Sequence, residues 1–150
     1  MHKIKSPLRG QVKNLSEVSD QVFAQGMLGV GVCIIPSEGK VFSPVNGTVA
    51  TVFHTKHAIA ITSDDGVKIL IHVGINTVKL GGAGFEAMIE KGSKITAGQL
   101  LLEFDMEAIQ KAGYSIETPV IITNHKEFAR VAHAEADKVT EENILMEIYE

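Results

Sequence analysis

The sequence predicts an all-β fold, an antiparallel β-sandwich or barrel-like arrangement with a few short helices. The first observation is the spacing of turn signals, because glycine-containing stretches such as SEGK, PVNG, SDDG and EKGSK recur roughly every eight to twelve residues. The second is the composition between them, which consists of short apolar or alternating runs rich in Val, Ile and Thr. Short strands at this spacing are typical of sandwiches and barrels.

The expected strands are the apolar runs between the turn signals: residues 30–35 (VGVCII), 47–53 (GTVATVF), 58–62 (AIAIT), 67–73 (VKILIHV), 100–104 (LLLEF) and 118–123 (TPVIIT). Residues 83–92 and 105–113 are expected to form short helices, because each has an apolar stripe that ends at a glycine. Residues 124–148 leave two possibilities open. Their alanine- and charge-rich first half favours a helix, whereas their last residues could instead close a sheet.

Length, charge and cysteine content limit the class of protein. A chain of 150 residues suits a single domain, residues 1–150, and can bury a core without disulfides. The net charge of −4 and the lack of basic clusters argue against nucleic acid as a partner. The longest apolar run, residues 27–35, is too short to cross a bilayer, so no direct membrane insertion is expected. Cys33 is the only cysteine and is expected in the core of a cytoplasmic protein.

Two of the six histidines, His57 and His72, flank the turn-like SDDG segment and suggest a hairpin. If its loop comprises residues 63–66, the two histidines stand directly opposite, with Cβ atoms about 4.5–5.5 Å apart. If the turn is only residues 65–66, they are diagonal neighbours at about 7–8 Å. An odd-length loop or a bulge would place the two rings on different faces. Thr55 is expected on the face of His57 because side chains alternate along a strand.

Adjacent imidazoles constrain each other's charge, since the first proton disfavours the second. At least one of His57 and His72 should therefore be neutral near pH 7, with a nitrogen lone pair able to attack phosphorus or bind a metal. The Thr55 hydroxyl could fix a ring tautomer. The alternative is that both histidines are ordinary structural residues on a half-buried β-face.

The stretch PVNGTVATVFHTKHAIAI, followed by ILIHVGINTVKLGGAGFE, closely resembles the glucose-type EIIA domain of the bacterial phosphoenolpyruvate-dependent sugar phosphotransferase system. The likeness extends over about residues 4–124. It implies an antiparallel β-sandwich, the duplicated hybrid motif, that acts as a phosphocarrier. Such a domain accepts a phosphoryl group from the histidine of the carrier protein HPr and passes it to a cysteine of the EIIB domain of a sugar permease. The resemblance implies neither a metal nor a cofactor.

The resemblance also assigns roles to residues. His72 matches the phosphoacceptor of the H-x-G-I motif, His57 matches the supporting ring of T-x-H-A, and Thr55 matches the threonine that orients that ring. The family's docking patch for partner proteins falls on apolar positions: Val22, Phe23, Met27, Leu28, Phe53, Leu70 and Val78. Phe53 and Leu70 are also expected on the histidine face from strand alternation.

The sequence departs from the family pattern at two positions, since Val30 and Asn76 stand where the family usually has acidic residues. The loss of these two carboxylates is expected to make the site less negative, which could either raise its tolerance for the phosphoryl group or alter the choice of partner. A regulatory binding module, controlling permeases or enzymes through its phosphorylation state, is the main alternative function. A zinc peptidase needs a third ligand and an H-x-H pair that the sequence lacks. A biotinyl or lipoyl carrier is disfavoured because Lys56 lies in a strand-like run. The sequence does not name the sugar.

Overall fold

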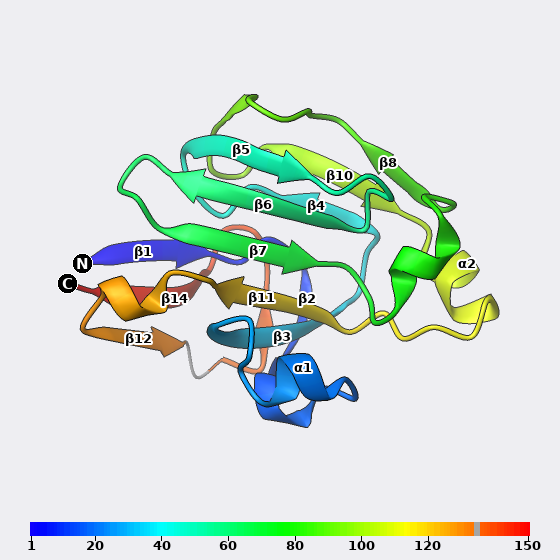
Figure 1. Ribbon diagram of the computed structural model, residues 1–150, viewed down its shortest axis with the longest axis horizontal. Coiled ribbons are helices and arrows are strands. Elements are labelled where there is room, and N and C mark those ends of the chain that lie inside the picture. The colour runs from blue at the N-terminus through cyan, green and yellow to red at the C-terminus, as the bar shows by residue number, and fades with distance from the viewer. Residues whose placement is uncertain (134–135) are drawn as a thin grey trace.

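The computed structural model describes residues 1–133 and 136–150, which form antiparallel sheets joined by short helices and turns (Figure 1). Its largest sheet has the order β13-β2-β3-β11-β7-β6-β5-β9. In that order the strands are β13 (Lys138–Val139), β2 (Gly10–Asn14), β3 (Val30–Pro36), β11 (Thr118–Ile122), β7 (Lys68–His72), β6 (Ala58–Ser63), β5 (Gly47–Val52) and β9 (Lys94–Ile95).

Two smaller sheets complete the described strands. One has the order β1 (His2–Lys5), β14 (Ile144–Tyr149) and β12 (Arg130–His133), and it places the two ends of the chain side by side (Figure 1). The other has the order β4 (Lys40–Phe42), β10 (Leu100–Phe104) and β8 (Phe85–Ala87). The helical elements are α1 (Gln21–Ala24), α2 (Met106–Lys111) and the 3₁₀ turns η1 (Leu15–Glu17), η2 (Thr77–Leu80) and η3 (His125–Glu127). None of the described helices is long and apolar enough to cross a membrane.

The main core lies between the large sheet and the two smaller ones. Strand alternation assigns the two faces of the large sheet, because Ile69 and Ile71 of β7 are buried in this core whereas Leu70 and His72 point the other way. We call these the inner face and the outer face. Burying each isoleucine side chain stabilises the fold by about 1.5–3 kcal/mol. Packing of the inner face therefore holds β7 rigidly, and with it the side chains on the outer face.

A second, smaller cluster covers part of the outer face. It consists of Leu15, Val18, Phe23, Cys33, Ile75 and Ile121, with Leu70 packed against it. The expected core position of Cys33 is confirmed, since the residue is fully buried and burial raises the pKa of its thiol to about 12. This cluster packs α1 and its flanking turns onto the sheet beside His72.

The predicted β-sandwich is confirmed, but one of the two predicted short helices is wrong. The helix predicted within residues 105–113 is confirmed as α2, Met106–Lys111, since the Asp105 side chain accepts from the Ala108 amide and the helix is followed by Gly113 at φ 90°. Residues 83–92 instead contain β8, which pairs with β10. The positive φ of Gly84 prevents a helical start there, and Phe85 gains more from burial against Phe104 than from a single helical turn.

The open question over residues 124–148 is decided in favour of a sheet. Their first half contains only the short turn η3 before β12 begins, so the helical possibility is wrong for the residues described there; residues 134–135 lie outside the described residues. Their last residues form β14 between β1 and β12, where Leu145, Met146 and Ile148 are fully buried. Core burial outweighs the helix propensity of alanine in this segment.

Candidate functional site

His57 and His72 meet on the outer face of the large sheet. Their ring centroids lie 4.7 Å apart with an angle of 78° between the planes. His57 is only 3% exposed, whereas His72 is half-buried. The expectation that the two rings meet is therefore confirmed.

The hairpin register that led to this expectation is nevertheless wrong in both of its forms. Ala58, and not His57, stands opposite His72 across β6 and β7. The Ser63 amide donates to the Val67 carbonyl at 2.9 Å, which leaves an odd, three-residue tip at 64–66. In a regular hairpin this loop would place the two histidines on different faces.

A turn before β6 brings the rings together instead. Lys56 has a left-handed backbone with φ 60°, and its amide donates to the Phe53 carbonyl at 2.7 Å. The chain therefore leaves strand geometry between β5 and β6, so alternation does not apply to His57. The His57 backbone remains in place because its carbonyl accepts from the Val73 amide at 2.7 Å.

The hydrogen bond from His72 to Gly74 determines which ring nitrogen of His72 is free. His72 Nδ1 lies 2.7 Å from the Gly74 carbonyl oxygen. A carbonyl oxygen can only accept, so Nδ1 carries the hydrogen and donates it. In the neutral ring the lone pair is then on Nε2.

Gly74 can present its carbonyl in this way only because it has no side chain. Its φ is 79°, which is in the left-handed region that favours glycine. A Cβ atom there would lie 2.5 Å from Thr77 Cγ2 and 2.8 Å from the Ser115 carbonyl oxygen. The glycine of the H-x-G motif is thus required by both conformation and space.

Thr55 contacts the other ring. Its Oγ1 lies 2.5 Å from His57 Nδ1. A hydroxyl can donate or accept, so this contact alone is compatible with either tautomer of His57. If Thr55 donates, His57 Nε2 carries a hydrogen that it can offer to a ligand.

Both rings are held neutral at pH 7. Burial, together with the neighbouring His72, lowers the pKa of His57 to about 4. Burial also lowers the pKa of His72, against the opposing effects of the Gly74 carbonyl and the Asp20 carboxylate. The site therefore presents a neutral imidazole with an oriented lone pair beside a second neutral imidazole.

Aromatic and aliphatic side chains surround the pair. The Phe23 ring lies 4.9 Å from the His72 ring, and the Phe53 ring meets His57 edge-on at 5.6 Å. Five of the apolar residues expected in a docking patch are exposed: Val22, Met27, Leu28, Phe53 and Val78. The other two differ, since Phe23 is buried and Leu70 is half-buried in the outer-face cluster.

The two departures from the family pattern have different surroundings. Asn76 is exposed and lies directly after the site loop, where its left-handed φ of 61° suits an asparagine. Val30 is at the start of β3 and packs against the main core, on the inner face. Alternation along β3 therefore turns the Val30 side chain away from His72, and the effect of this substitution on the charge of the histidine site stays a prediction.

Some contacts of the site were not predicted from the sequence. The acceptor role of the Gly74 carbonyl, the contact of Phe23 with His72 and the capping of α1 by Asp20 are all structural findings. The signals in the sequence were the glycine in H-x-G and the expected place of Phe23 in the docking patch. Among residues 1–133 and 136–150, no cluster of three or more His, Cys, Asp or Glu side chains is arranged to hold a metal ion.

Comparison with known proteins shows the family of this chain. Residues 2–128 match the family described as phosphoenolpyruvate-dependent sugar phosphotransferase system, EIIA 1. The chain belongs to this family. The EIIA chain is 52% identical over 121 residues to the glucose-specific EIIA component of the phosphotransferase system of Bacillus cereus, covering 81% of this chain and 73% of that relative.

Other relatives are longer. The EIIA chain is 50% identical over 143 residues to the beta-glucoside-specific EIIBCA component of Bacillus subtilis, which covers 95% of this chain but only 24% of that protein. The chain thus spans about a quarter of the length of that relative. Among solved structures, the glucose permease IIA of Mycoplasma capricolum superposes with a TM-score of 0.87 at 34% identity, covering 97% of this chain and 94% of that one.

We expect the stability of the EIIA chain to depend on pH through His57. Its pKa is 6.5 when unfolded and about 4 when folded, so the stabilisation from the neutral ring is complete above pH 6.5 and is lost as the pH falls toward 4. Urea denaturation should show the free energy of unfolding falling by roughly 1–3 kcal/mol across this window. His57→Gln should flatten the slope. An unchanged slope in His57→Gln would contradict the buried neutral ring.

We expect Gly74→Ala to disrupt the tautomer of His72. Gly66→Ala is the matched control, because Gly66 has a similar φ of 87° but no atom within 4 Å of its added Cβ. Both variants should lose roughly 1–3 kcal/mol of stability from backbone strain. Only Gly74→Ala should reduce the Nδ1–H population of His72 in ¹⁵N NMR spectra. An equal effect of both variants on His72 would show that the Gly74 carbonyl does not select the tautomer.

Proposed function

We propose that this EIIA chain is a phosphocarrier that accepts a phosphoryl group from phospho-HPr on His72 and passes it to the cysteine of an EIIB domain during sugar uptake. The observation that carries the proposal is the bond from His72 Nδ1 to the Gly74 carbonyl, which leaves the Nε2 lone pair free beside His57. Membership of the EIIA family supports the reaction class, and relatives named EIIBCA support an EIIB-type acceptor.

In the first transfer, the lone pair of His72 Nε2 attacks the phosphorus of the phosphohistidine on HPr. A new N–P bond forms as the old one breaks, and the bonding pair returns to the HPr ring. In the second transfer, the EIIB thiolate attacks phosphorus and the pair returns to His72 Nε2. Phosphoryl transfer of this kind asks the protein chiefly for in-line positioning and for charge stabilisation.

His57 and Thr55 would provide that stabilisation. With Thr55 donating to His57 Nδ1, the Nε2–H of His57 is free to donate to a phosphoryl oxygen. The pKa of His57, about 4 in the unphosphorylated state, keeps that ring neutral. Burial separately lowers the pKa of His72, which favours the unprotonated ring that attacks. After transfer, the negative phosphoryl group favours a more basic His57. The same ring thus serves the free and the phosphorylated states.

The exposed apolar residues around the pair form the docking surface in this proposal: Val22, Met27, Leu28, Phe53 and Val78. Phe23 and Leu70 lie beneath it and support it. A modest apolar patch suits partners that must bind and leave. Asp20 is the carboxylate close enough to influence His72, and it would face a basic group on HPr. We also propose that residues 1–150 form one domain that acts in the cytoplasm.

An intact-mass experiment tests this function. The protein is incubated with phosphoenolpyruvate, enzyme I and HPr, beside His72→Ala, His57→Gln and the exposed-histidine control His54→Ala. We expect the mass of one phosphoryl group on every protein except His72→Ala. His57→Gln should pass the group to an EIIB domain about 10²–10³-fold more slowly, because it lacks the positioned donor.

Two outcomes would contradict the proposal. Phosphorylation of His72→Ala would place the acceptor elsewhere. A wild-type protein that gains no mass, while a control EIIA domain is phosphorylated in parallel, would mean that this chain takes no part in the relay. The exposed apolar surface would then be interpreted as that of a regulatory binding module.

A further inference from the structure

A part-buried ion pair lies on the outer face, outside the histidine site. Lys13 Nζ of β2 lies 2.5 Å from Oε2 of Glu117, whose side chain is only 13% exposed. The other carboxylate oxygen, Oε1, accepts from the hydroxyls of Ser19 and Ser115, each at 3.0 Å. Ser115 Oγ in turn accepts from the Glu117 amide at 3.1 Å. One carboxylate therefore joins the segment that carries Lys13 and Ser19 to the segment that carries Ser115 and Glu117, although Lys13 and Glu117 are 104 positions apart in the sequence.

The sheet register places this pair in line with His72. Lys13 pairs with Cys33, and Cys33 pairs with Pro119, two residues after Glu117. Val120 pairs with Ile71, so continuing the register by one residue brings Pro119 beside His72. The ion pair thus spans the sheet from β2 to the entry of β11, on the face that carries the histidines.

Ser19 connects the network to α1, which packs beside His72 and forms one wall of the site. Ser19 precedes Asp20, whose carboxylate accepts from the Val22 amide at 2.8 Å and caps α1. This helix carries Phe23, whose ring packs 4.9 Å from the His72 ring. A four-residue helix has little stability of its own, so its position depends on such tertiary contacts.

Ser115 connects the network to the Gly74 segment, which forms a second wall of the site. The Ser115 carbonyl oxygen accepts from the Ile75 amide at 3.1 Å. Ile75 follows Gly74, whose carbonyl holds His72 Nδ1. The Ser115 carbonyl also lies so close to Gly74 that an added Cβ there would be only 2.8 Å away. The position of residue 115 therefore limits where the Gly74 carbonyl can be.

Charge keeps the network together. Burial raises the pKa of Glu117, but the hydrogen bonds from Lys13, Ser19 and Ser115 more than offset it, so the net pKa is lowered. The hydrogen bond to Glu117 raises the pKa of Lys13 in turn. Because the carboxylate is largely removed from water, losing Lys13 would leave its charge poorly compensated.

We propose that Glu117, held by Lys13, is a positioning residue for His72. It fixes α1 and the Gly74 segment relative to each other, and so sets the orientation and burial of the imidazole that carries the nucleophilic Nε2. The inference rests on the proposed phosphocarrier function, but the positioning itself can be measured in the unphosphorylated protein.

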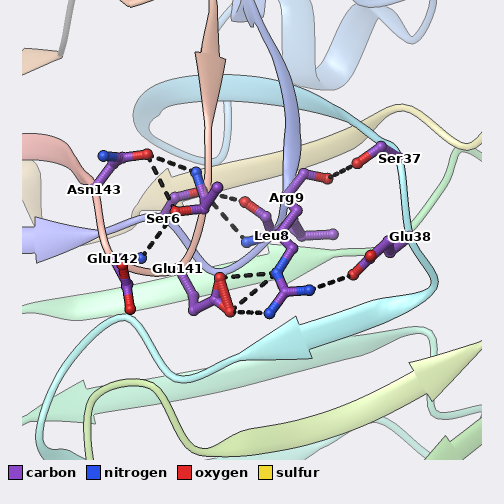
Figure 2. A network of polar contacts seen from close by, with 9 residues as sticks. Ser6, Leu8, Arg9, Ser37, Glu38, Glu141, Glu142 and Asn143 are labelled. Carbon is purple, nitrogen blue, oxygen red and sulfur yellow. Dashed lines mark hydrogen bonds and ion pairs between the residues drawn. The ribbon is translucent and has the colours of Figure 1, made fainter.

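The chain offers a matched control in a second ion pair. Arg9 contacts Glu141 through Nε at 2.8 and 3.0 Å and also contacts Glu38 at 2.8 Å (Figure 2). This pair joins the segment before β2 to the loop before β14, and none of the contacts drawn in Figure 2 leads to a histidine. Glu141→Gln therefore removes a comparable ion pair without disturbing either wall of the site.

The experiment compares the full chain with Glu117→Ala, Glu117→Gln, Lys13→Met and Glu141→Gln. Histidine ¹⁵N NMR of the unphosphorylated proteins reports the pKa and tautomer of His72, denaturation reports stability, and steady-state kinetics with phospho-HPr reports kcat and KM. In Glu117→Ala we expect the pKa of His72 to rise toward its ordinary value, the Nδ1–H population to fall and kcat to drop about tenfold.

The other variants refine this expectation. Lys13→Met and Glu117→Gln should each move His72 in the same direction by less, because each loses the bond between residues 13 and 117 but keeps an oxygen that accepts from both serines. Glu141→Gln should lower stability and leave His72 and kcat unchanged. If Glu117→Ala and Lys13→Met alter only stability, as Glu141→Gln does, the positioning role is wrong. If His72 responds as expected but even the wild-type protein takes no phosphoryl group, the positioning role stands and the phosphocarrier function fails.

Discussion

The hydrogen bond from His72 Nδ1 to the Gly74 carbonyl is the interaction on which the rest of the site depends. It decides that the lone pair of a neutral His72 is on Nε2, because a carbonyl oxygen cannot donate. It also explains why residue 74 is a glycine. The carbonyl faces the ring because Gly74 has a left-handed φ, in which a side chain would be strained, and an added Cβ would lie too close to Thr77 and Ser115. A single backbone group thus sets the direction in which the imidazole can react.

The two faces of the large sheet have different roles in the site. The inner face holds β6 and β7 in place through isoleucines that are buried in the main core. The outer face buries His57 and half-buries His72, and this burial keeps both rings neutral at pH 7. The smaller outer-face cluster and the Lys13–Glu117 pair hold the walls around His72. A reactive but uncharged histidine pair results from this combination of rigid support and partial burial.

The sequence was sufficient for the fold class and for the identity of the two histidines, but not for the route by which they meet. Turn spacing and apolar runs reveal strands, because both are local properties. The contact of His57 with His72 depends instead on the left-handed backbone of Lys56 and on an odd-length hairpin tip. The alternation of apolar and polar residues along a strand predicts neither feature. The helix expected at residues 83–92 failed because Phe85 is needed in the core. Glu117 and Lys13 are 104 positions apart, and no local pattern links them.

The most direct test of the account asks which nitrogen becomes phosphorylated. Protein labelled with ¹⁵N in its histidines would be phosphorylated with phosphoenolpyruvate, enzyme I and HPr, and the nitrogen bonded to phosphorus would be identified by ¹⁵N–³¹P coupling. We expect the phosphoryl group on Nε2 of His72, with Nδ1 still protonated and hydrogen-bonded. A phosphoryl group on Nδ1 of His72, or on either nitrogen of His57, would contradict it.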